Sequence, residues 1–99
     1  MNQRQETPIV YDPRGIVEAV PQTLAKRVKN LDGLRVAVLD NAKWNAGALL
    51  RKTAEHLGGQ AAFAAINFYR KESFSKYAAP ELIATIAADN DVALTAIGD

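Results

Sequence analysis

The stretch that decides the fold runs from Leu34 to Leu57 and reads LRVAVLDNAKWNAGALLRKTAEHL. It begins with a short, nearly continuous apolar run, which is typical of a parallel strand covered on both faces. We therefore expect residues 34–39 to form the central strand of a sheet. Apolar residues then recur with helical spacing from Ala46 onward, and the pair Gly58-Gly59 ends that pattern. The stretch thus predicts a strand, a polar loop and a helix.

The chain after this stretch repeats the same alternation. Residues 61–68 predict a second strand, so the first helix is bracketed in a βαβ unit whose crossover should be right-handed. A polar loop from residue 69 to 78 precedes a second helix that opens with Pro80, and residues 92–97 form a third apolar run. The order strand, helix, strand, helix, strand predicts an α/β fold, a three-layer open parallel sheet of the flavodoxin or Rossmann type.

The N-terminal segment is expected to add an arm and one further helix. Residues 1–20 should form an arm and a turn, and residues 21–99 a single α/β domain. A helix should begin at Pro21, because three apolar residues follow at helical spacing. They are Leu24, Val28 and Leu31. A sheet of three strands leaves edges that another chain can extend, so a homo-oligomer is one expectation.

The composition excludes several classes of protein. Basic and acidic side chains nearly balance, with a net charge of +1 and no basic block, so nucleic acid is not an expected partner. Apolar runs are too short to span a bilayer and the N-terminus lacks a signal-peptide core, which predicts a cytoplasmic protein without membrane contact. The sequence has no cysteine, so it holds no disulfide, thiolate metal site or cysteine nucleophile. No glycine-rich nucleotide fingerprint follows a strand, and His56 has no second histidine with which to share a metal, so neither a cofactor nor a metal is expected.

Polar residues follow the first predicted strand, at the edge where open α/β sheets bind ligands. The candidates are Asp40, Asn41, Lys43 and Asn45. A carboxylate, two amides and an ammonium beside a helix N-terminus suit a polar or anionic small molecule. Two alternatives stay open, because an asparagine can serve only as an N-cap and Lys43 can be solvated. Trp44 either stacks on a ligand or packs within the protein.

A second polar cluster occupies the loop from Tyr69 to Tyr77, which contains three cations. Such a loop can clamp a phosphate or a carboxylate, and the alternative is a solvated surface loop. Gly98 and Asp99 follow the third strand at the same edge of the sheet. If the strand order reverses between the first and third strands, residues 40–45 and these two residues flank one crevice.

Several segments resemble the UGSC-like proteins, a family named for a selenocysteine or cysteine, Gly, Ser, Cys motif. The most specific are a D-N-x-K-x-N segment after the first strand and a strand that ends in Gly-Asp. The matching pieces, in chain order, are Asp12-Pro13-Arg14-Gly15, Leu39 to Ala46, Lys71, Ser75, the helix from Pro80 and Ile97-Gly98-Asp99. Together they cover most of the chain.

The resemblance implies a redox function. In that family the Gly-Asp pair is followed directly by the motif, so the native chain is expected to continue beyond Asp99. Because a selenocysteine codon, UGA, is easily read as a stop, we expect a chain truncated there and without activity of its own. By the same resemblance, the catalytic residue would come just after Asp99, and the partner would be a small-molecule substrate or a thiol reductant. The implied substrate-binding residues are Asp40, Asn41, Lys43, Asn45, Lys71, Ser75, Gly98 and Asp99.

Two other classes of function stay open. The chain can be a complete, non-catalytic module that binds a small anion at residues 40–45. It can also be a receiver-like regulatory domain, in which Asp40 at the end of the central strand accepts a phosphoryl group. Stabilisation by a ligand would favour the first, and a thermal shift with phosphoryl donors and Mg²⁺ would favour the second.

Overall fold

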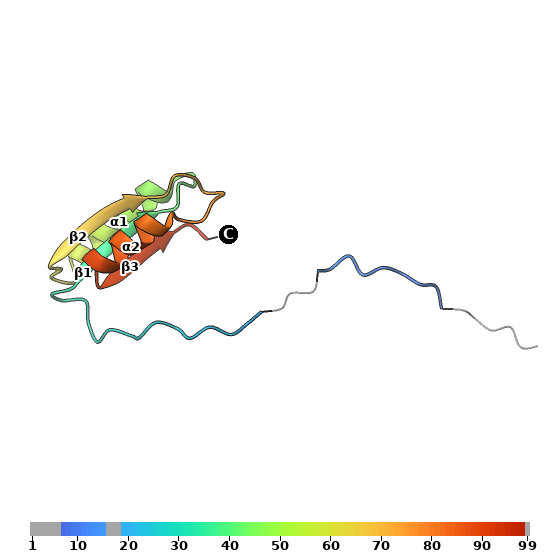
Figure 1. Ribbon diagram of the computed structural model, residues 1–99. Helices are drawn as coiled ribbons and strands as arrows, with labels where there is room; N and C mark the ends of the chain where they lie inside the picture. Colours follow the sequence, from blue (N-terminus) through green and yellow to red (C-terminus); the bar gives the residue numbers. More distant parts are fainter. Residues whose placement is uncertain (1–6, 16–18, 99) are drawn as a thin grey trace, which may run out of the picture.

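The computed structural model describes residues 7–15 and 19–98. Strands and helices alternate along the chain as the sequence predicted, and Figure 1 shows the sheet between the two helices. The elements are β1 (Arg35–Asp40), α1 (Ala46–Gly58), β2 (Ala65–Arg70), α2 (Pro80–Asp89) and β3 (Val92–Ala96). The expected α/β fold is confirmed.

The sheet has the order β2-β1-β3, and both pairings of β1 are parallel. The strand predicted to be central is therefore central. Because the chain moves from β1 to one side and then returns across β1 to the other side, two crossovers of the same hand place α1 and α2 on opposite faces of the sheet. The strand order reverses between β1 and β3, which is the switch point where such folds bind ligands.

The apolar core lies between the sheet and α1. Its buried residues come from alternate positions of β1 and from one stripe of α1, and they are Val36, Val38, Leu50 and Ala54. Partly buried side chains of both outer strands complete the layer, including Ile66 of β2 and Leu94 of β3. This arrangement follows from the two periodicities, since alternate residues of a strand and residues three to four apart on a helix share a face.

Asn90 joins α2 to the other face of the sheet. Its side chain is only 9 % exposed and is fully hydrogen bonded. The Oδ1 atom accepts a hydrogen bond from Asn67 Nδ2 at 3.0 Å, while Nδ2 donates to Tyr69 Oη and to the carbonyl of Ile86, each at 3.0 Å. Because Asn67 and Tyr69 belong to β2 and Ile86 to α2, one amide connects a helix end to a sheet edge.

The boundaries of β2 differ most from the expectation, since those of β1 and β3 shift by one residue at most. β2 begins at Ala65 and not at residue 61, because the preceding residues form a connection held by Asp32, whose Oδ1 accepts a hydrogen bond from Ala62 N at 2.8 Å. β2 also continues to Arg70, two residues into the segment predicted to be a loop. These residues pair with the end of β1, so pairing with a neighbouring strand overrides their loop-like composition.

The prediction of a helix from Pro21 is wrong. Residues 19–30 contain neither helix nor strand, and the side chain of Leu24 is 76 % exposed. An isolated helix of this length is marginal in water unless its apolar face packs on another element. The apolar spacing was therefore correct as a pattern but had no surface to pack against.

An ion pair between Arg35 and Asp91 lies at the end of the sheet where β1 and β3 begin. The Asp91 carboxylate accepts hydrogen bonds from the Arg35 backbone N–H at 2.9 Å and from its guanidinium, with Nη2 to Oδ1 at 3.1 Å. These bonds, first from the side chain and then from the backbone of Arg35, hold the pKa of Asp91 below its usual value. The turn before β3 is thereby tied to the start of β1.

This ion pair predicts a pH-dependent contribution to stability. A carboxylate whose pKa is lowered by folding stabilises the fold above its unfolded pKa of about 3.9, and the contribution is lost as the pH falls through the folded pKa. Asp91→Asn should therefore lower the free energy of unfolding most at neutral pH, with a shrinking difference from wild type at pH 4 and pH 3, measured by urea denaturation. Asp12→Asn is the matched control, since Asp12 pairs with exposed Arg14 two residues away and should not affect core stability at any pH. A difference for Asp91→Asn that stays constant with pH would contradict the assignment.

Candidate functional site

The ends of β1 and β3 meet at the carboxyl edge of the sheet. Asn41 makes the connection: its backbone N–H donates to the carbonyl of Ala96 at 3.1 Å, and its side-chain Nδ2 donates to the carbonyl of Ile97 at 2.6 Å. The loop after β1 and the segment after β3 are therefore neighbours, as expected for a strand order that reverses between these strands. The candidate site lies at this edge.

The loop after β1 is shaped by its own side chains. Asp40 Oδ1 accepts a hydrogen bond from Ala42 N at 2.7 Å, and Asn41 Oδ1 accepts one from Lys43 N at 3.3 Å. Ala42 and Asn45 both have left-handed backbone conformations, with φ of 69° and 64°. A left-handed alanine is uncommon, so the hydrogen bonds of the loop hold a conformation that the residue alone disfavours. Asn45 occupies the N-cap position of α1, but its side chain makes no capping hydrogen bond.

The first hollow at this edge, which we call the aromatic hollow, has a volume of about 450 Å³ and is lined by Lys43, Trp44, Phe74 and Ile97. The four residues come from the segments that follow β1, β2 and β3. Trp44 is 88 % exposed, which argues against the interpretation that it packs within the protein. Exposed aromatic side chains beside an ammonium suit an organic ligand that has an apolar or aromatic part.

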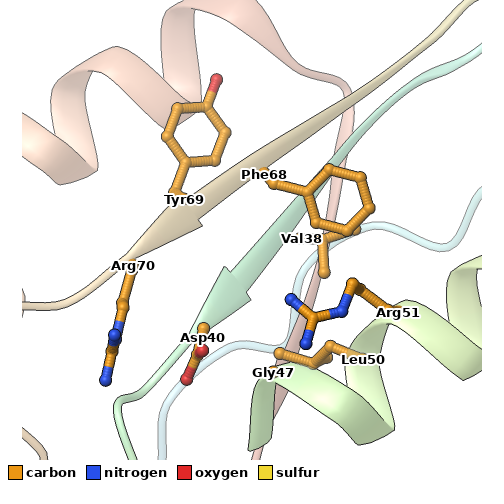
Figure 2. A pocket seen from close by; sticks show the side chains of 8 residues that line it. All are labelled: Val38, Asp40, Gly47, Leu50, Arg51, Phe68, Tyr69 and Arg70. Atoms are coloured by element: carbon orange, nitrogen blue, oxygen red, sulfur yellow. The ribbon is translucent and has the colours of Figure 1, made fainter.

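The second hollow, which we call the arginine pocket, has a volume of about 290 Å³ and lies on the α1 face of the sheet. Its main lining residues are Asp40, Gly47, Leu50, Arg51, Phe68 and Arg70. Figure 2 shows Arg51 reaching from α1 toward Asp40, with Arg70 alongside Asp40 on the neighbouring strand. The side chain of Asp40, the last residue of β1, thus faces a different hollow from Lys43 in the loop that follows.

The other predicted site residues, among those that the structure describes, line neither hollow. The backbone N–H of Lys71 donates to the carbonyl of Asp40 at 2.9 Å, which joins the loops after β1 and β2. Ser75 is exposed, and its hydroxyl lies 2.9 Å from that of Ser73. Gly98 is exposed beyond β3, and Asp99 lies outside the described residues.

Sequence reasoning did not place several of the residues that line the hollows. Phe74 and Ile97 carry no chemical motif, and only the meeting of three segments at one edge reveals them. Arg51 was expected to point away from the apolar face of α1, but its guanidinium extends over Gly47 toward Asp40. Arg70 was one of the three cations of the expected oxyanion-clamping loop, but it is the last residue of β2 and lies opposite Asp40 in the register of β1 and β2. Strand register is the signal that would have found it.

In the part of the chain that the structure describes, no cluster of three His, Cys, Asp or Glu residues has the geometry to hold a metal ion. None of the helices among these residues is long and apolar enough to cross a membrane.

Comparison with known proteins gives one finding. The sequence model of the UGSC family matches residues 9–99, a range that includes every strand and helix and both hollows. No curated protein and no solved structure matches the chain.

Proposed function

The chain belongs to the UGSC family, and we propose that it is the N-terminal part of a selenol- or thiol-dependent redox protein whose reactive residue follows Asp99. In this proposal the chain ends at a UGA codon for selenocysteine, and the 99 residues alone are inactive. The observation that best supports it is the contact between Asn41 and the carbonyl of Ile97, at 2.6 Å. It fixes the chain leaving β3 beside the loop after β1.

The reach of the chain limits where the reactive residue would lie. A residue at position 100 would be three residues beyond Ile97, and an extended chain covers at most about 3.6 Å per residue. The selenium or sulfur atom would therefore be held at the carboxyl edge, next to the switch point between β1 and β3. A rigid strand end is a suitable support for a reactive group, because the supporting residues are fixed by pairing and packing.

The chemistry proposed there is thiol-disulfide exchange. The selenolate or thiolate attacks one sulfur of a disulfide substrate, forms a mixed bond and releases the other sulfur as a thiolate. The cysteine of the motif then displaces the first sulfur and closes an internal bond, and an external thiol reductant reopens that bond. The substrate gains two electrons, which the reductant supplies. A reducing compartment such as the cytoplasm suits this cycle.

The described residues would support the exchange in two ways. A cationic side chain near a thiolate or selenolate favours the anionic, reactive form, and Lys43 is the proposed cation. Trp44 and Phe74 would contact an apolar part of the substrate in the aromatic hollow. Asn41 and Asn45 would orient its polar groups, with Lys71, Ser75 and Gly98 as outer contacts.

The first experiment is to sequence the gene through codon 99 and the frame that follows. We expect UGA followed by codons for Gly, Ser and Cys. A UAA or UAG codon, or a following frame without this motif, would overturn the proposal of a truncated redox protein. The alternative of a non-catalytic module that binds a small anion would then be preferred, with the receiver-like domain as the third candidate.

A second experiment tests the chemistry on the extended protein. The chain with its downstream residues, and with cysteine at the reactive position, should reduce a small aromatic disulfide in the presence of a thiol reductant. Serine at that position should abolish the reaction, and the 99-residue chain should show none. Equal rates for the cysteine and serine versions would contradict the proposed role.

A further inference from the structure

Three charged side chains surround the arginine pocket without neutralising one another. Among residues 7–15 and 19–98, the ion pairs join Arg14 to Asp12 and Arg35 to Asp91, so neither Arg51 nor Arg70 has a carboxylate within 4.0 Å. Asp40 uses Oδ1 to accept the hydrogen bond from Ala42 N and directs Oδ2 toward Gly47. Two guanidinium groups therefore face one carboxylate across the pocket, which leaves an excess of positive charge.

Gly47 has no side chain and therefore leaves room for the Arg51 guanidinium next to Asp40. A Cβ atom on Gly47 would lie 2.9 Å from Asp40 Oδ2 and 3.8 Å from both terminal nitrogens of Arg51. The space beside the Gly47 Cα is thus bordered by Asp40 Oδ2 on one side and by both terminal nitrogens of Arg51 on the other. Any other residue at this position would fill the space between them.

Most of the other lining residues are apolar. Val38 and Leu50, both buried in the core, lie beneath it, and Phe68 extends an exposed ring over it from β2. Arg70 and Asp40 occupy paired positions on β2 and β1 and approach the pocket from the same face. A ligand here would meet two guanidinium groups, one carboxylate oxygen and an aromatic ring.

From this arrangement we propose that the arginine pocket binds the oxyanion, a carboxylate or a phosphate, of a small organic molecule. Arginine presents paired N–H donors that match the oxygens of such groups. Asp40 Oδ2 accepts a hydrogen bond from a hydroxyl or amine of the same ligand, and Phe68 contacts its apolar part. The pocket shares no lining residue with the aromatic hollow, and its proposed binding function does not depend on the redox proposal.

The test is a titration of the purified chain with inorganic phosphate and with malonate, each against chloride at the same ionic strength. Binding is followed by the NMR shift of the Gly47 amide and by the melting temperature. We expect saturable shifts at Gly47 with either oxyanion and none with chloride. Tighter binding of phosphate or of malonate identifies which oxyanion the ligand carries, and equal responses to all three anions would overturn the proposal.

Variants of the arginines give the sharper test. Arg51→Gln and Arg70→Gln should each weaken binding of the preferred oxyanion on the order of tenfold, because each removes a charge-assisted hydrogen bond. Lys52→Gln is the matched control, since Lys52 is the neighbour of Arg51 on α1 and does not line the pocket. Its effect should stay within about twofold, as expected for a screened surface charge. Equal losses in the three variants would show only general attraction of anions and would overturn the site.

Asp40→Asn should strengthen the binding of an oxyanion, whereas the arginine variants should weaken it. This variant keeps an oxygen that can accept the bond from Ala42 N but removes the negative charge beside the proposed anion. The malonate dianion, which has no hydroxyl to donate to Asp40, should bind a few-fold more tightly because the repulsion is lost. Unchanged or weaker malonate binding would contradict the placement of the anion next to Asp40.

Discussion

Leu50→Ala should lower the free energy of unfolding by about 2–5 kcal/mol, the loss expected when a buried leucine leaves a cavity. Leu50 is 2 % exposed and is the largest α1 side chain in the core between that helix and the sheet. A small domain has a stability of only about 5–15 kcal/mol, so this single change should remove a large part of it. Urea denaturation followed by circular dichroism measures the loss.

The preceding residue provides the control. Leu49→Ala makes the same chemical change on the same helix, but Leu49 is 50 % exposed and lies outside the core. Its expected loss is below about 1 kcal/mol, because little apolar surface returns to water. Equal losses for the two variants would mean that α1 packs on the sheet through a different face.

Asn90→Asp should lower the free energy of unfolding by about 2–4 kcal/mol at neutral pH. The change removes the Nδ2 donor that serves Tyr69 Oη and the carbonyl of Ile86, and it places a charge at a buried position. Both effects are costly, since a buried polar group without a partner and a buried charge each lose solvation. Urea denaturation at neutral pH and at pH 4 should show a smaller loss in acid, where protonation restores a donor and removes the charge.

Two further variants test whether the loss of stability comes from the buried hydrogen bonds of Asn90 or from any exchange of asparagine for aspartate. Asn30→Asp is the control, because exposed Asn30 uses only its Oδ1, as the acceptor for Asp32 N at 3.1 Å, and an aspartate can keep that bond. Tyr69→Phe should destabilise wild type and have little effect on an Asn90→Ala background, in which the Tyr69 hydroxyl has lost its side-chain partner. Additive effects of these two changes would show that Tyr69 and Asn90 do not interact energetically.

The fold was largely predictable because strand and helix periodicities are local properties of the chain. The apolar run of β1 required burial on both faces, and the structure places Val36 and Val38 against α1 while Ala37 is buried on the other side. The helix expected from Pro21 shows the limit of the same reasoning. Its apolar spacing is helical, but stability depends on a surface elsewhere in the fold, which local pattern does not reveal.

The candidate site was predictable only in part, for a related reason. Asp40 ends a buried strand and Asn41 follows it, and their polar character marks a ligand edge directly. Arg51 and Arg70 become neighbours of Asp40 only through the length of α1 and the register of β1 with β2. Phe74 and Ile97 likewise meet only because three strands end together. The sequence marked Arg70 only as one cation of a polar segment, and it gave no sign of the other three.

The pairing of β1 with two strands at different distances along the chain has a kinetic consequence. Arg35 pairs with Ala65, whereas Val36 pairs with the more distant Val92, and the entropy lost on closing a loop grows with its length. We therefore expect β1, α1 and β2 to associate first during folding, and β3 to add afterwards. The arginine pocket, built wholly from those earlier elements, would be complete before the chain has folded fully. The aromatic hollow, which includes Ile97, would form only when β3 joins the sheet. Any reactive group beyond β3 would therefore reach its place beside the loop after β1 only when the entire domain is native.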